Sequence, residues 1–295
     1  MDMIHAKDAD GDGTKDVLQA NTYIEYRQGS MKEIFGGCFG DYDYETEFTE
    51  DKGFSIPKLH NTFVNFRPDD NSKNHVDKVF GAGEGCLGIR EADQSQDRSY
   101  VLVDIPDNNE YYLNTEFFGS GSNNGLGMGH GFKETTAEGF NLDNVSAIID
   151  LAHGRVGAAY GGSYNEGITR RTLINVPEQS TINLGKIFGG AYGTNALPPC
   201  DVYDANVDYR NTSEKARVSG GIYGGNNNVR RTIYGHVDIS SPVWQTDSTL
   251  STVYGAGYGP LTWSEYTQVN LKSGAKVYQG YGGGEQGNVL NAESS

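Results

Sequence analysis

A run of acidic residues near the start of the chain has the residue types and spacing of a calcium site. Calcium takes about six to eight oxygen ligands at short range, and carboxylates at alternate positions of a glycine-bent loop supply them. The sequence DADGDGTKD at 8–16 has this pattern. We therefore expect residues 1–20 to form an acidic N-terminal segment with a candidate calcium loop. Its ligands would be the carboxylates of Asp8, Asp10, Asp12 and Asp16 and the carbonyl of Thr14.

This loop resembles the calcium loops of EF-hand, dockerin and thrombospondin type 3 repeats. It departs from the EF-hand at the twelfth position, where an EF-hand has a bidentate Glu and this chain has Gln19. The alternative interpretation is a solvated acidic turn near a frayed terminus. Calcium is the one cofactor that the sequence indicates.

Two arginine pairs recur in similar context, in the sequences RRTL and RRTI. Arginine forks bind carboxylates and sulfates through two parallel hydrogen bonds, so these pairs are candidate binding residues for an acidic polysaccharide. The alternative is that they pair with the many acidic residues of this chain. The residues concerned are Arg170, Arg171, Arg230 and Arg231.

Aromatic residues that precede glycine are a third set of candidates. Tyr160, Tyr223 and Tyr254 belong to a signature that recurs along the chain and joins an aromatic residue to Gly. If these rings point outward, they offer faces on which sugar rings pack. If they point inward, they form a buried stack, which is the commoner arrangement.

The aromatic signature recurs eight times and alternates with a second one, in which an apolar residue, a polar residue and an apolar or aromatic residue follow one another. The aromatic residues of the first signature are Phe35, Phe80, Phe118, Tyr160, Phe188, Tyr223, Tyr254 and Tyr281. The polar residues of the second are Glu25, Asn65, Asp104, Asp150, Asn175, Asp208, Asp238 and Asn270. The second signature recurs on average about every 35 residues, which is a period typical of repeat architectures.

Both signatures predict short strands. Alternation with period two places the apolar pair of the second signature inward and its polar residue outward. The glycines of the first signature predict corners, because a residue without Cβ tolerates positive φ. Units of two strands bury their apolar faces only by stacking. We therefore expect residues 21–295 to form an all-β, right-handed parallel β-helix of about eight irregular coils. The alternative is a β-propeller, which needs four strands in each blade.

Stacked coils would also bring the polar residues of the second signature into an outward row. We expect a solubilising face with partial amide ladders there, or a face that binds cations or another ligand.

Composition excludes several classes of function. The net charge of −16 repels phosphate backbones, so nucleic acid is not an expected partner. No apolar run is long enough for a membrane span. The six histidines form no HExxH motif, and the chain has no GxSxG or Walker sequence. Catalytic residues cannot be assigned from the sequence.

The Tyr-Gly-Gly and Phe-Gly-Gly repeats resemble those of bacterial cell-surface β-helix proteins, the group that includes autotransporter passengers and adhesin-like outer-membrane proteins. The resemblance covers roughly residues 20–290. It implies an exported, adhesin-like or glycan-binding protein without catalytic activity, located outside the cell or on a bacterial surface, with carbohydrate or a surface protein as partner. Two alternatives remain: a polysaccharide lyase or glycoside hydrolase acting on acidic glycans, and a structural stalk module within a longer surface protein.

Overall fold

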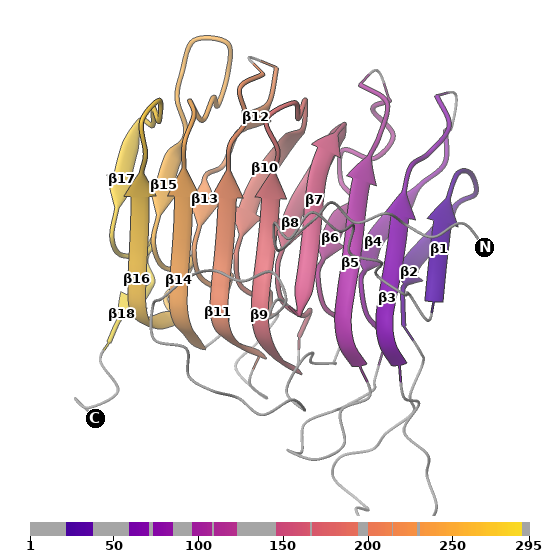
Figure 1. The fold of residues 1–295 in the computed structure, drawn as a ribbon, viewed down its shortest axis with the longest axis horizontal. Helices are drawn as coiled ribbons and strands as arrows, with labels where there is room; N and C mark the ends of the chain where they lie inside the picture. Colours follow the sequence, from indigo (N-terminus) through magenta and orange to yellow (C-terminus); the bar gives the residue numbers. More distant parts are fainter. Residues whose placement is uncertain are drawn as a thin grey trace, which may run out of the picture.

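The chain forms a stack of β coils. The computed structural model describes residues 22–37, 59–70, 73–84, 96–107, 109–122, 146–165, 167–193, 200–213, 215–228 and 231–290. In this part of the chain all regular structure is β. The coils follow one another along the long axis, with β1 near one end and β18 near the other (Figure 1). The predicted calcium residues of segment 8–16 lie outside the described residues.

Two parallel sheets of nine strands each form the sides of the stack. The first sheet consists, in order, of β1 (Thr22–Tyr26), β3 (Leu59–Phe66), β5 (Gln96–Asp104), β7 (Ala147–His153), β9 (Gly167–Val176), β11 (Cys200–Tyr209), β14 (Arg231–Ile239), β16 (Trp263–Leu271) and β18 (Asn288–Val289). The second consists of β2 (Met31–Phe35), β4 (Val76–Phe80), β6 (Glu116–Phe118), β8 (Arg155–Tyr160), β10 (Asn183–Phe188), β13 (Ile222–Tyr223), β15 (Thr252–Tyr254) and β17 (Gln279–Tyr281), with β12 (Arg217–Val218) paired to β10.

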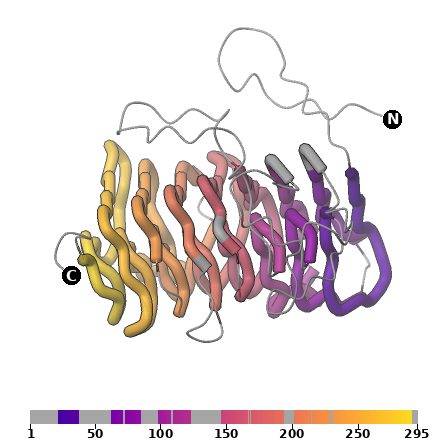
Figure 2. Tube along the Cα trace, turned by 90° about the horizontal axis from the view of Figure 1, so that it is seen from below, coloured from indigo at the N-terminus to yellow at the C-terminus, as the bar shows by residue number. Residues whose placement is uncertain are grey.

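The parallel β-solenoid predicted from the sequence is confirmed. Within the described ranges, eight coils each give a strand to both sheets, and β18 begins another coil. Strands pair with the equivalent strand of the next coil, so the sheets run continuously along the stack (Figure 2). A propeller, with its separate four-stranded blades, is therefore wrong.

The core lies between the two sheets. In the inner coils of the first sheet the apolar pair of the signature points inward, as Ile149 and Leu151 do with no exposed surface. In the second sheet the residue before each aromatic points inward, as Ile187 does. The aromatic residues themselves form a separate cluster on the other face of the second sheet. Two layers of apolar packing therefore share that sheet.

The repeat glycines are needed for a reason other than the one that the sequence suggested. Positive φ occurs at Gly154 and Gly221, among others, but at none of the described repeat glycines that follow the aromatic residues. At those positions a Cβ would collide with the next coil: on Gly161 it would overlap the carbonyl oxygen of Gly189 and crowd Thr172. The two sheets converge at this edge, so only glycine fits between the stacked backbones.

Hydroxyl groups of the first sheet tie that converging edge together. Thr172 Oγ1 donates to the carbonyl oxygen of Gly189 at 2.5 Å. Thr62 Oγ1 donates to the carbonyl oxygen of Gly81 in the same way, at 2.5 Å. Each bond joins the two sheets. The same edge therefore combines a steric need for glycine with a hydrogen bond that fixes how closely the sheets approach.

Candidate functional site

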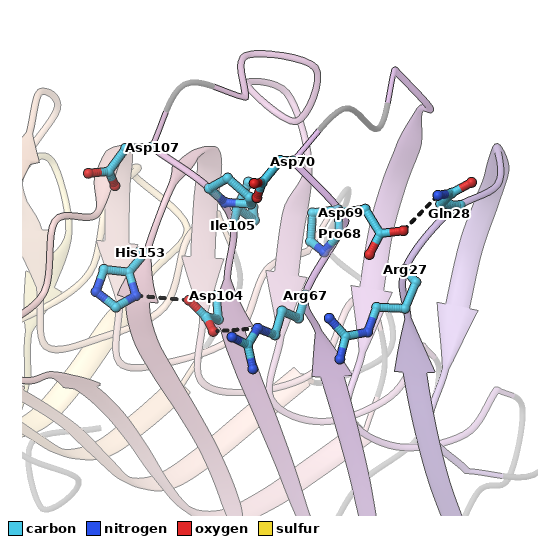
Figure 3. A pocket seen from close by; sticks show the side chains of 11 residues that line it. Arg27, Gln28, Arg67, Pro68, Asp69, Asp70, Asp104, Ile105, Asp107 and His153 are labelled. Atoms are coloured by element: carbon cyan, nitrogen blue, oxygen red, sulfur yellow. Dashed lines mark hydrogen bonds and ion pairs between the residues drawn. The ribbon is translucent and has the colours of Figure 1, made fainter.

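A cavity of about 670 Å³ lies at the edge of the first sheet, over its first coils. Figure 3 shows its side chains gathered where the strands end. It is lined by Arg27, Gln28, Arg67, Pro68, Asp69, Asp70, Asp104, Ile105, Pro106, Asp107 and His153. The volume falls within the range of small-molecule sites.

Parallel pairing brings these residues together from distant parts of the sequence. Arg27 follows β1, Arg67 follows β3, Asp104 ends β5 and His153 ends β7. Because the strands are parallel and in register, their carboxyl ends meet at one edge of the sheet. The side chains thus come from four successive coils, a spacing that no local sequence motif would show.

Asp104 is the centre of a charged cluster in this cavity. Its Oδ1 lies 2.8 Å from Nδ1 of His153, and its Oδ2 lies 3.2 Å from Nε of Arg67 (Figure 3). An ionised carboxylate only accepts hydrogen bonds, so His153 donates to it from Nδ1. The other ring nitrogen, Nε2, takes no part in this bond. The carboxylate holds both side chains at the cavity wall.

Apart from Pro68, Ile105 and Pro106, the rest of the lining is polar. Gln28 Nε2 donates to Asp69 Oδ2 at 2.6 Å, and Arg27 pairs with Glu25 beside the cavity. Asp70 forms no ion pair with any residue that the structure describes. Carboxylate, amide, guanidinium and imidazole groups all have planar arrays of donors or acceptors. Such arrays can bind neighbouring hydroxyl groups two at a time.

The three predicted tyrosines lie in one aromatic ladder along the second sheet. Tyr160 stacks on Phe188 at 5.1 Å and Tyr223 stacks on Tyr254 at 4.8 Å between ring centroids. Tyr160 is 3% exposed and Tyr223 is fully buried, whereas Tyr254 is half-buried. Rings that are stacked on both faces leave only an edge for a ligand.

Burial and nearby carboxylates raise the pKa of two tyrosines of the ladder, Tyr160 and Tyr223. Burial is the larger cause of the raised pKa of Tyr223, and a hydrogen bond to Glu285 adds to it. The pKa of Tyr160 is raised by burial first and then by the charge of Glu116. The pKa of Glu116 is itself raised by burial, against the opposing effect of Lys78.

The arginine pairs are not brought together. The residue of β11 that pairs with Arg171 is Asp204. The residue of β11 that pairs with Thr232, directly after Arg231, is Val202, and Val202 pairs with Thr169 on the other side. Arg171 and Arg231 therefore lie on different rows of the sheet. Each has an acidic partner.

Their ion pairs are close. Arg171 Nε lies 2.6 Å from Asp204 Oδ2, and Arg231 Nη2 lies 3.0 Å from Asp201 Oδ2. Burial, with the charge of Arg171 as a second cause, lowers the pKa of Arg170. Arg230 lies outside the described residues.

The outward polar row on the first sheet forms with one exception. The residue between Asn65 and Asp150 in this row is Leu102, not Asp104. Amide to carboxylate bonds link other neighbours: Asn175 Nδ2 donates to Asp150 Oδ1 at 2.7 Å. An equivalent bond joins Asn270 Nδ2 to Asp238 Oδ1 at 2.6 Å. Partial amide ladders are therefore present.

Sequence reasoning named one residue of the cavity, Asp104, but placed it in the outward row, and it missed the others, although a signal for two of them exists. Arg27 and Arg67 each come directly after the last residue of an apolar, polar, apolar signature. Aligning the signatures places these two cations on adjacent coils. A second feature was missed too: the residues four positions after the aromatic form a row of isolated bridges, in the order Glu84, Ser122, Tyr164, Tyr192, Asn227 and Tyr258.

Within the described ranges, no group of three or more His, Cys, Asp or Glu side chains is placed to hold a metal ion. The same part of the chain contains no helix of the length and apolarity needed to cross a membrane. Comparison of the chain with family models, with curated proteins and with solved structures finds no match.

Proposed function

We propose that this chain is a non-catalytic, glycan-binding β-solenoid that acts outside the cell, and that the cavity around Asp104 is its sugar site. The observation that carries the proposal is the lining of this cavity. It combines carboxylates, guanidinium groups and an amide on a rigid sheet edge. Sugar hydroxyls need donors and acceptors in planar pairs, and these side chains supply both.

The exposure of the side chains that line the cavity also supports ligand binding. The Arg67 side chain is 56% exposed and that of His153 is 43% exposed, whereas that of Asp104, which holds both, is 26% exposed. The less exposed carboxylate of Asp104 therefore fixes the orientation of Arg67 and His153, whose side chains remain accessible to a ligand. A preorganised polar surface loses little conformational entropy when a ligand binds. The extracellular, adhesin-like role rests on the repeats and the acidic composition, and it belongs to the same proposal.

A glycan array probed with the labelled chain tests this function. We expect binding to a limited set of glycans, followed by measurable titration of one of them in calorimetry. Arg67→Gln and Asp70→Asn should each lower that affinity about tenfold or more, because a hydrogen bond to a charged group contributes about 1.5–3 kcal/mol. Lys272→Gln, near the other end of the stack, should leave it unchanged. Binding to no glycan contradicts the proposal and favours a structural stalk.

The pair of His153 and Asp104 favours one second candidate, a polysaccharide lyase. With Nδ1 held by the carboxylate, Nε2 of His153 could accept a proton from the carbon beside a uronate carboxylate, while Arg67 neutralises that carboxylate. The electron pair of the broken C–H bond forms a C=C bond as the glycosidic C–O bond on the next ring carbon breaks, and the leaving oxygen takes a proton from water. Incubation with polygalacturonate would then release unsaturated uronate products that absorb in the ultraviolet. Loss of this release in His153→Gln, with binding retained, would replace the non-catalytic function by this one.

A further inference from the structure

A second cavity, of about 360 Å³, continues the corner at which the first one lies. It is lined by Asp107, Gly154, Arg155, Thr181, Asn183, Lys215, Arg217 and Asp247. Asp107 lines both cavities, so they meet there. We call the two together the corner groove.

A one-residue turn explains why the two cavities share a corner. His153 ends β7 and Arg155 begins β8, with only Gly154 between them. Gly154 has φ of 115°, and a Cβ there would overlap the side chain of Ile105. His153 therefore faces the first cavity while Arg155 lines the second. The groove runs across the strands, along the axis of the stack.

The register of the second sheet sets the distance between two arginines along this groove. Arg155 pairs with Asn183, and Asn183 pairs with Arg217. Arg155 and Arg217 are thus two strand spacings apart, or about 9.6 Å. Asn183 lies between them as a neutral donor. Lys215 adds a third cation to the wall of the same cavity.

The carboxylates that pair with the two arginines are exposed to solvent. Arg155 pairs with Glu110, whose side chain is 62% exposed, and Arg217 pairs with Asp247, whose side chain is 95% exposed. The Arg155 pair is exposed on both sides and contributes little to stability, so a ligand anion can replace Glu110 at low cost. The Arg217 side chain is only 16% exposed, but its partner Asp247 extends into solvent and can likewise give way to a ligand anion. Asp107 also lines this cavity, so its wall carries carboxylates beside the three cations.

We infer that the corner groove binds a linear acidic polysaccharide, with its sulfate or carboxylate groups on Arg155, Lys215 and Arg217 and its neutral hydroxyls in the first cavity. This inference rests on the proposed function and adds the chemical class of the glycan. In an extended acidic chain, anions that lie one disaccharide apart are separated by a distance comparable to the spacing of the two arginines. Guanidinium forks bind such anions through paired hydrogen bonds.

Polygalacturonate and its fully methyl-esterified form provide the test, because they share a backbone and differ in charge. We expect the unmodified chain to bind polygalacturonate at least tenfold more tightly than the ester, with an affinity that falls as salt is added. The double variant Arg155→Gln and Lys215→Gln should lose that preference and keep its affinity for the ester. Arg210→Gln, an equally exposed and ion-paired arginine away from the groove, should behave as the unmodified chain does.

A gain of affinity gives an independent readout. Asp247→Asn removes the exposed partner of Arg217, so affinity for the acidic chain should rise several-fold. Heparin in place of polygalacturonate distinguishes sulfate from carboxylate recognition. Equal binding of polygalacturonate and its ester, or an unchanged double variant, would overturn the inference and leave the proposed function intact. Absence of binding to every glycan would contradict the proposed function itself.

Discussion

Asp104 lies opposite His153 across two neighbouring coils, although its place in the repeat signature would set it opposite Asp150. The register shifts after Val103, where β5 pairs with β7. Because Leu102 is the residue that pairs with Asp150, Asp104 lies at the end of its strand, at the edge of the sheet. The shift then sets Asp104 opposite His153 instead of Ala152. There it reaches both His153 and Arg67. The irregularity therefore creates the charged cluster of the candidate site.

Asp104→Asn should weaken glycan binding and leave the fold intact. The amide keeps the size of the side chain but loses the charge that orients Arg67 and His153. Their ion pairs are partly exposed, so we expect the free energy of unfolding to change by less than about 1 kcal/mol. Affinity for the glycan should fall about tenfold. Calorimetric titration, paired with urea unfolding of the same variant, measures both quantities. Unchanged affinity would show that this cluster does not position the sugar-binding groups.

Gly161→Ala should destabilise the stack because its Cβ has no space. The new methyl group would overlap the Gly189 carbonyl and crowd Thr172, and overpacking of this kind costs about 1–3 kcal/mol. Gly282 occupies the same position of the last repeat, where no atom of the described residues outside its two chain neighbours lies within 4 Å of the place that a Cβ would take. Gly282→Ala is therefore a matched control that should change stability by less than about 0.5 kcal/mol. Urea unfolding distinguishes the two, and equal effects would contradict the steric explanation.

The fold was predictable because its determinants repeat. Eight aromatic positions and most of the polar positions fall into register as the two signatures indicate. The third coil shows where this reasoning ends. Both 101–103 and 103–105 begin and end with apolar residues, and the sequence favours the second because Asp104 is polar. In the structure, residues 101–103 occupy the signature position, because the ring of Tyr100 stacks on that of Phe63 at 4.9 Å. This contact sets Val101 beside Val64.

The candidate site was less predictable, because it depends on contacts between coils. Arg27 and His153 are far apart in the sequence, and only the parallel register brings their strand ends together. The arginine pairs show the converse. Similar local sequence did not place Arg171 and Arg231 on the same row, since the register of each strand depends on its whole length.

Phe188→Ala should be far more destabilising than Tyr281→Ala, although both belong to one aromatic ladder. Phe188 is fully buried between Tyr160 and Tyr223, with centroid distances of 5.1 and 4.7 Å. Truncation of a buried Phe costs about 3–5 kcal/mol. Tyr281 is 44% exposed and, among the residues that the structure describes, stacks on Tyr254 alone, so its truncation should cost about 1 kcal/mol. Chemical unfolding measures both, and similar values would show that the ladder contributes little to stability.

The buried tyrosines predict loss of stability at alkaline pH. Burial raises the pKa of Tyr160, Tyr209 and Tyr223 in the folded chain. Their contribution to stability is complete below the unfolded pKa of about 10 and is lost as pH rises through the folded values, because the unfolded chain releases protons that the folded chain retains. Tyrosinate absorbance and circular dichroism should therefore change together above about pH 10. Ionisation of these three residues with the β signal intact would contradict the prediction.

Tyr209→Phe tests which part of a buried tyrosine matters. The ring of Tyr209 is fully buried in the core, and its hydroxyl has no hydrogen-bond partner among the residues that the structure describes. Removing an unsatisfied hydroxyl should leave neutral stability unchanged or raise it by about 1 kcal/mol. The variant should also lose stability less steeply with rising pH, since one group with a raised pKa is gone. Urea unfolding at neutral and alkaline pH measures both effects. A destabilised variant at neutral pH would mean that the hydroxyl is satisfied in solution, by water or by a part of the chain outside the described ranges.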